Sequence, residues 1–169
     1  YLPFSKHLHI VLAFPNTYYS NLEKKGKFNN MEAVTKEVKL MLDPTADPFA
    51  APVDADASPQ RFGAKDVTDL TWKNLLDAYS CTECGRCTSA CPANITGKKL
   101  SPRKIMMDTR DRLTEVGELI KKNGKDYQDG KSLLGDYITE EEVWACTSCN
   151  ACVQECPVNI DPLSIIVDL

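Results

Sequence analysis

Eight cysteines fall in two short runs, and no cysteine lies elsewhere in the 169 residues. Each run has the form C-x2-C-x2-C-x3-C-P, the first from Cys81 to Pro92 and the second from Cys146 to Pro157. Thiolates at this spacing are typical ligands of iron-sulfur cubes, because the two-residue gaps let the backbone curl around one small cluster. The sequence therefore predicts two [4Fe-4S] clusters.

The two runs also agree beyond their cysteines. An Asn-Ile pair follows each proline, as Asn94-Ile95 and as Asn159-Ile160. We interpret the runs as an internal duplication of one cluster-binding unit.

Two other interpretations of the cysteines fit less well. Structural zinc uses two C-x2-C pairs for each site and has no third cysteine at an equal step. A disulfide scaffold spreads its cysteines through the loops that need closing. A purely structural role for one of the two clusters stays open.

The fourth cysteine of each run precedes a proline, which fixes the local turn and directs that thiolate away from its own triplet. In two-cluster ferredoxins this cysteine ligates the other cluster, and we follow that crossed pattern. Cluster 1 is assigned to Cys81, Cys84, Cys87 and Cys156, and cluster 2 to Cys146, Cys149, Cys152 and Cys91.

Helices are expected to carry the chain into both runs. One begins at Thr68 or Asp69 and ends at Cys81. Another begins at Thr139, whose pairing with Glu142 has the spacing of a capping box, and it leads to the second run.

A longer helix is expected between the runs. Ser101 and Pro102 form a clear helix start, and Asn123 and Gly124 form a good helix end. Since no segment shows the strict alternation of a half-buried strand, we predict an all-α fold.

The chain divides into three predicted regions. Residues 1–28 are a juxtamembrane stub, residues 29–66 are an amphipathic helix and a tether rich in Pro, Ala and Asp, and residues 67–169 are the dicluster domain. Asn30 is the expected cap of the amphipathic helix, which ends near Asp43. Its apolar side consists of Met31, Val34, Val38 and Met41.

Two complete cysteine runs separated by a long helix resemble the α-helical ferredoxin domain of the C-type iron-sulfur subunits of heterodisulfide reductase and their relatives. The resemblance covers residues 67–169. It implies that electrons pass singly through two [4Fe-4S] clusters, from a cytochrome b, flavin or quinone site to a cysteine-rich catalytic partner. No catalytic residue is expected in this chain. Succinate dehydrogenase iron-sulfur subunits resemble it less, because they carry a plant-type domain ahead of this one.

The stretch from Leu2 to Ile10 resembles the end of the last membrane helix in the nitrate reductase gamma subunit family. That family supplies a haem b ligand from Phe-Ser-Arg-x-x-His-Ile, which implies that His9 is an axial haem ligand in a longer protein. His7 has no counterpart. Because the first residue is Tyr1, we expect further chain upstream. The implied location is the cytoplasmic face of the inner membrane.

Charge and hydropathy exclude several classes of protein. The net charge of -4 and the lack of a dense basic face argue against binding of nucleic acid. No run of 18 apolar residues is present.

A small basic group follows the first run and either docks a partner or is a solvated helix entrance. It consists of Lys98, Lys99, Arg103 and Lys104. Arg86 lies inside the first cluster loop, where a cation raises the reduction potential.

Two other functions remain as alternatives. One is an iron-sulfur redox sensor, and the other is an electron-transfer subunit of a soluble flavin dehydrogenase. A self-contained enzyme would need an iron with an open ligand position, and eight cysteines for two clusters leave none.

Overall fold

The computed structural model describes residues 7–23, 27, 30–43, 62–124 and 129–169. Most of the predicted tether and Leu2 to Lys6 of the predicted stub lie outside these residues. Within them the chain is helical and contains no strand, with one isolated bridge between Leu134 and Ile138. The predicted all-α fold is confirmed.

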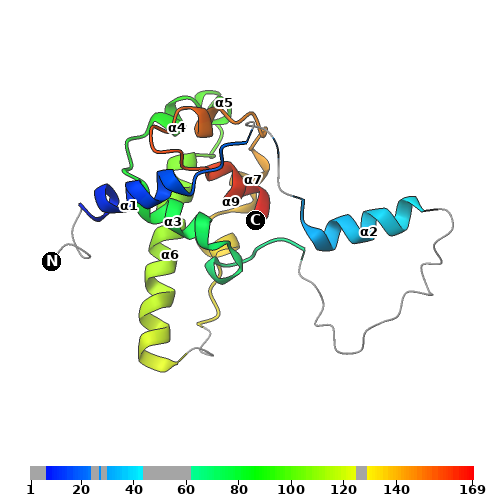
Figure 1. Ribbon diagram of the computed structural model, residues 1–169, viewed down its shortest axis with the longest axis horizontal. Coiled ribbons are helices and arrows are strands. Elements are labelled where there is room, and N and C mark those ends of the chain that lie inside the picture. The colour runs from blue at the N-terminus through cyan, green and yellow to red at the C-terminus, as the bar shows by residue number, and fades with distance from the viewer. Residues whose placement is uncertain (1–6, 24–26, 28–29, 44–61, 125–128) are drawn as a thin grey trace.

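The helices pack into one body from which two elements project (Figure 1). The long helix α6 extends below the body, and α2 lies apart from it. In chain order the elements are α1 (Leu8–Tyr18), α2 (Glu32–Leu42), η2 (Val67–Asp69), α3 (Trp72–Ser80), α4 (Arg86–Ser89), α5 (Pro92–Ile95), α6 (Pro102–Asn123), η3 (Leu133–Tyr137), α7 (Glu140–Trp144), α8 (Ala151–Gln154) and α9 (Pro162–Asp168).

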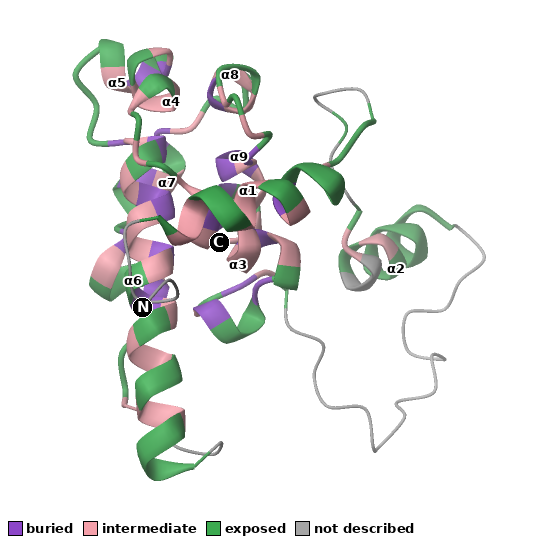
Figure 2. Ribbon diagram, turned by 60° about the vertical axis from the view of Figure 1, so that its left-hand side comes forward, coloured by how far each residue is buried: buried purple, intermediate pink, exposed green. Residues whose placement is uncertain are grey.

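Helix α6 begins and ends where the sequence predicts. The Ser101 hydroxyl accepts the Lys104 amide, Pro102 is the first helical residue, and Gly124 closes the helix with a φ of 96°. Its first half is the buried half, including Ile105 and Met106, whereas no residue of α6 beyond Arg112 is buried (Figure 2). The end of α6 that is held in the core is therefore the end that adjoins the first cysteine run.

The helix before the second run also matches its prediction. Thr139 and Glu142 form a reciprocal capping box, in which the Thr139 amide donates to the Glu142 carboxylate at 2.9 Å. The helix α7 ends at Trp144, two residues before Cys146.

Two predicted helix starts are wrong. Thr68 and Asp69 belong to the separate turn η2, because the Asp69 carboxylate accepts the amides of Lys65 and Asp66 and so closes that turn by itself. The helix α3 begins at Trp72, where the Thr71 hydroxyl accepts the Asn74 amide.

The second wrong start is Asn30. The N-cap of α2 is Met31, which makes no side-chain capping bond. The helix ends before Asp43, as predicted. Val34, Val38 and Met41 are exposed on it, so the amphipathic pattern forms a helix without burying its apolar side.

The core lies where α3, α6 and α9 contact each other. Fully buried side chains include Val67 before α3, Ile105 in α6 and Ile165 in α9. At about 25 cal/mol for each square ångström of apolar surface removed from water, this burial is the main stabilising contribution available to so small a domain. The core therefore joins the helix that leads into the first cysteine run with the helices that follow the two runs.

Helix α1 packs against α3 and is fastened by a buried polar residue. The Asn16 side chain is fully buried, donates to the Val158 carbonyl at 3.0 Å and accepts from the Lys73 ammonium at 3.0 Å. In the described part of the chain, no helix is both long enough and apolar enough to span a bilayer.

Candidate iron-sulfur centre

The structure gathers the eight thiols into two sets of four. The first set lines one cavity and comprises Cys81, Cys84, Cys87 and Cys156. The second set lines another cavity and comprises Cys91, Cys146, Cys149 and Cys152. Each cavity thus takes three cysteines from one run and the fourth from the other run.

The two cavities are similar in size. The space free of protein atoms, counted to the solvent opening, is about 400 Å³ in the first and about 310 Å³ in the second. Both cavities open to solvent on one side, where Cys84 of the first and Cys149 of the second are exposed. Cys91 and Cys152, which both line the second cavity, are buried. Two copies of one cofactor would need two such matching spaces.

The backbone repeats the same path around both cavities. Glu83 and Ser148 hold equivalent positions in the two runs and have φ values of 57° and 53°. Gly85 and Asn150 are also equivalent, with φ values of 82° and 60°, and each is the residue before a one-turn helix. These residues are in the left-handed region, which is uncommon outside glycine and Asn. The internal duplication inferred from the sequence therefore extends to the backbone.

The repeat breaks after the prolines. Pro92 begins the helical turn α5, in which Ile95 is exposed, whereas Asn159 has a φ of 54° and Ile160 is buried. The matching Asn-Ile pairs thus occupy different environments.

Amides point at several of the sulfurs, as expected around a cluster. The Ser148 amide donates to Cys146 at 3.5 Å, and the Ile160 amide donates to Cys156 at 3.3 Å. The Arg86 amide lowers the pKa of the Cys84 thiol. Such hydrogen bonds stabilise thiolate charge and tune the potential of a cluster.

Burial acts on the thiols in the opposite direction. It raises the pKa of Cys81, Cys87 and Cys146, and it raises the pKa of Cys152 to about 12. A thiol with a raised pKa gives up its proton when a metal centre takes the negative charge, so binding and deprotonation are coupled.

The two cavities are neighbours. The short helices α4 and α8, one from each run, pack against each other. Proximity to Cys87 contributes to the raised pKa of Cys152, after burial. At the N-terminus of α6, Pro102 lines the second cavity and Arg103 lines the first. The start of α6 therefore contributes one residue to each of the two cavities.

The donor set suits cubanes. Each cavity offers four thiols, and in the described part of the chain no three His, Cys, Asp or Glu side chains are placed to hold a single metal ion. A zinc ion holds four sulfurs at about 2.3 Å from one point, whereas a cubane holds each thiolate on a different iron and so spreads them further apart. The thiols and their spacing fit a [4Fe-4S] cluster in each cavity.

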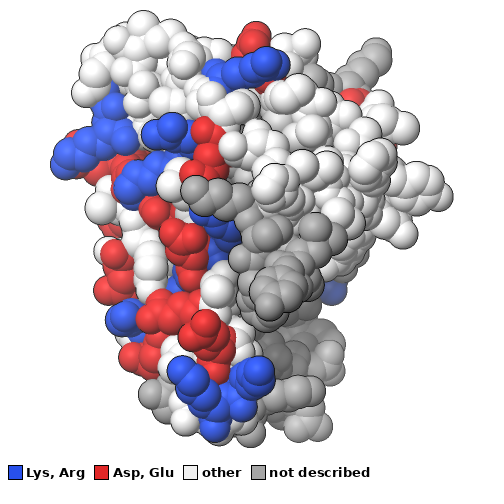
Figure 3. All heavy atoms as spheres, turned by 90° about the vertical axis from the view of Figure 1, so that its left-hand side faces the viewer, with Lys and Arg blue, Asp and Glu red and all other residues white. Residues whose placement is uncertain are grey.

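Two of the four residues in the basic group after the first run are paired. Lys99 bonds to Glu141 at 2.5 Å, and Lys104 bonds to Asp108 at 2.7 Å and Glu142 at 3.0 Å. Cations and anions mix along one flank of the molecule, beside a broad uncharged surface (Figure 3). The interpretation of Lys99 and Lys104 as solvated, paired residues therefore fits the structure better than a docking patch of a single sign.

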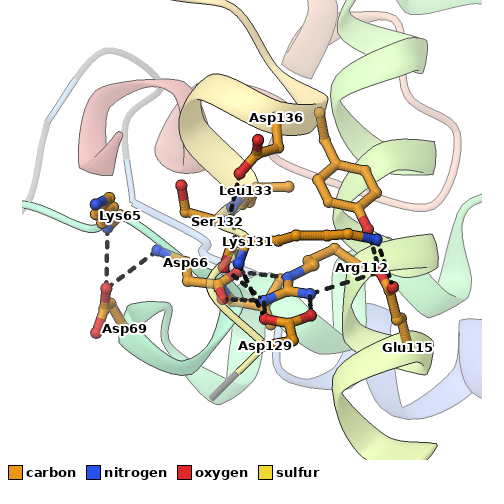
Figure 4. A network of polar contacts seen from close by, with 12 residues as sticks. Lys65, Asp66, Asp69, Arg112, Glu115, Asp129, Lys131, Ser132, Leu133 and Asp136 are labelled. Carbon is orange, nitrogen blue, oxygen red and sulfur yellow. Dashed lines mark hydrogen bonds and ion pairs between the residues drawn. The ribbon is translucent and has the colours of Figure 1, made fainter. Parts of the chain in front are cut away.

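A buried arginine in α6 joins three segments of the chain through a network of polar contacts (Figure 4). Arg112 in α6 is 2% exposed and bonds to Asp66 at 2.7 Å and to Asp129 at 2.6 Å. Its guanidinium also donates to the Lys131 carbonyl at 2.8 Å. The sequence did not indicate this network, because its members come from three distant segments and form no motif.

His9 lies in α1 and is half-buried, outside both cavities. His7, which precedes α1, is exposed. Neither histidine joins the eight thiols, and the haem role of His9 remains a prediction.

Comparison with known proteins agrees with this geometry. Residues 80–160 match the family described as the 4Fe-4S dicluster domain. The chain is 33% identical over 198 aligned positions to the probable iron-sulfur-binding oxidoreductase FadF of Bacillus subtilis, an alignment that covers 100% of this chain and 25% of that protein.

Two other relatives cover less of the chain. The EtfAB:quinone oxidoreductase of Syntrophomonas wolfei is 32% identical, over 65% of this chain and 18% of its own length. A subunit of the ferredoxin/F(420)H(2)-dependent CoB-CoM heterodisulfide reductase of Methanosarcina acetivorans is also 32% identical, over 63% of this chain and 52% of its own. No solved structure matches the chain at a significant level.

The chain thus spans only about a quarter of the first relative and less of the second. The matched segment contains all eight cysteines and most of the residues that line the two cavities. We conclude that the chain is an iron-sulfur protein whose residues 80–160 belong to the family of 4Fe-4S dicluster domains.

Proposed function

We propose that this chain relays single electrons through two [4Fe-4S] clusters, between a membrane cytochrome b or quinone site and a cysteine-rich catalytic partner. The observation that carries the proposal is the pair of neighbouring cavities, each lined by four thiols and both lined in part by the start of α6. When bound, the clusters supply one-electron acceptor and donor centres.

The chain's own residues hold these centres in place. We assign cluster 1 to the first cavity, with Cys81, Cys84, Cys87 and Cys156, and cluster 2 to the second, with Cys146, Cys149, Cys152 and Cys91. The packing of α4 on α8 keeps the two sites next to each other. Apolar side chains exclude water on the inner sides, among them Met106 and Ile160 in the first cavity and Leu100 and Ile166 in the second.

The proposed termini of the relay are supported by the names of the relatives. A quinone appears in the name of the EtfAB:quinone oxidoreductase, and a heterodisulfide in that of the reductase from Methanosarcina acetivorans. Both names support redox protein partners on either side of this module. The proposed place is the cytoplasmic face of the inner membrane, with His9 as a haem b ligand contributed to an upstream membrane domain.

An anaerobic redox titration followed by electron paramagnetic resonance tests the relay. We expect two signals, each appearing with a one-electron midpoint, because each cubane accepts one electron. Dithionite should reduce both without loss of iron. Clusters that bind but accept no electron from dithionite would contradict the relay and would leave only a structural role.

A second arm of the experiment addresses the sensor alternative. Far-ultraviolet circular dichroism of the oxidised and reduced forms should be the same for a relay, because a relay needs no conformational change. A large change of helicity on reduction would favour the sensor.

A further inference from the structure

The charges that line the two cavities are not alike. Arg86 and Arg103 both line the first cavity and are exposed, and neither makes an ion pair among the described residues. The Arg103 guanidinium reaches over the cysteine loop, with its Nη1 atom 3.9 Å from where a Cβ atom would stand at Gly85. Glu83, the one acidic residue of this lining in the described chain, is paired with Arg110 at 2.7 Å.

The second cavity has no charged side chain among the described residues of its lining. The position equivalent to Arg86 in the second run is Ala151. Within the described part of the chain, two unpaired cations thus face one set of thiols, and none faces the other.

We propose that the cluster of the first cavity has the higher reduction potential, and that Arg86 and Arg103 are the positioning residues that set this order. This inference rests on the proposed binding of one cluster in each cavity. It adds which of the two holds the electron when the chain carries one.

The physical reason is electrostatic. Reduction adds one negative charge to a centre that four thiolates already make negative, so a nearby cation favours the reduced form. The arginines are exposed, so salt screens part of their effect. Loss of both is therefore expected to lower the one-electron reduction constant about tenfold, which corresponds to about 59 mV.

The proposed order of the two reduction potentials also sets the favourable direction of electron transfer between the clusters. An electron that enters at the second cavity passes downhill to the first, and a partner that accepts it would dock where Cys84, Arg86 and Arg103 are exposed. Such a partner would be acidic around its own centre, as charge complementarity with two arginines requires.

Three variants of the intact chain test the order by redox titration with electron paramagnetic resonance. The double variant Arg86→Gln/Arg103→Gln should lower the reduction constant of the higher-potential cluster about tenfold and leave that of the other within about twofold. Ala151→Arg, which places a cation at the equivalent position of the second run, should raise the lower midpoint. Arg86→Lys, which keeps the charge, should leave both midpoints near their original values.

Lys98→Gln is the matched control, because it removes an exposed cation near the first run that lines neither cavity. The order is overturned if the double arginine variant shifts the lower midpoint instead, or shifts neither by more than Lys98→Gln does. The iron and sulfide contents of each variant distinguish failure of the proposed order of potentials from failure of the proposed function. A chain without clusters refutes the function, whereas a loaded chain with unmoved midpoints refutes only the order.

Discussion

Replacing Cys81 and Cys156 together is expected to cost the chain one cluster, whereas replacing Cys146 and Cys156 together is expected to cost both. In the structure Cys156 shares a cavity with Cys81, although it is much closer in sequence to Cys146. Two alanines in one cavity therefore leave the other cavity complete. Two alanines in different cavities leave each with three thiols.

The readout is iron per chain after anaerobic preparation. We expect about four irons in Cys81→Ala/Cys156→Ala and close to none in Cys146→Ala/Cys156→Ala, because a cubane carries four irons. The matched pair on the other side is Cys91→Ala/Cys146→Ala, which should also keep about four. Far-ultraviolet circular dichroism checks that each variant remains helical.

An uncrossed arrangement gives the opposite pattern. If the fourth cysteine of each run served its own triplet, Cys146→Ala/Cys156→Ala would keep about four irons and Cys81→Ala/Cys156→Ala would keep none. That result would remove the reason to treat the two runs as one folding unit.

Replacing Arg112 by methionine is expected to destabilise the fold by about 3–5 kcal/mol, the usual cost of removing one partner from a buried ion pair. Asp66 and Asp129 would lose the guanidinium that bonds to both. The segment before α3, helix α6 and the segment before η3 would then be joined less firmly. Denaturant unfolding of the loaded protein measures the loss.

The control for Arg112 lies on the same helix. Lys122 is 71% exposed and lies 3.9 Å from Glu118, so Lys122→Met should change stability by less than about 0.5 kcal/mol. If Arg112→Met were as mild as Lys122→Met, the network would not hold the three segments together.

The network also fixes the sign of a pH effect. Arg112 holds the pKa of Asp129 at about 2, below the value of about 3.9 for an unfolded aspartate. Because the folded value is the lower one, the pair stabilises the fold fully above about pH 4, and this contribution is lost as the pH falls toward 2. The difference in unfolding free energy between the natural chain and Asp129→Asn should therefore stay constant between about pH 8 and pH 5.

The sequence predicted the features that depend on local chemistry. The cysteine spacing, the Ser101-Pro102 helix start and the Thr139–Glu142 capping box each use residues a few positions apart. The repeat was recognised in the cysteine loops for the same reason, because the cysteines of each loop lie a few positions apart. The backbone follows the same path there, and Gly85 and Asn150 both have left-handed dihedrals.

What the sequence did not predict depends on contacts between distant segments. Asn16 is buried, and its side chain forms hydrogen bonds with Lys73 and Val158, which lie 57 and 142 positions away. The pairing of Lys99 with Glu141 spans 42 positions, so the sequence alone placed that lysine in a basic group and did not reveal its acidic partner. The start of α3 was misplaced by a turn whose bonds compete with helix initiation.

The most direct test of the two-cluster assignment is the metal and sulfide content of the anaerobically prepared chain. Two cubanes require about eight irons and about eight inorganic sulfides per chain, with no zinc in stoichiometric amount. Stoichiometric zinc without sulfide would contradict the assignment, because the thiols of each cavity would then hold single ions and could pass no electron.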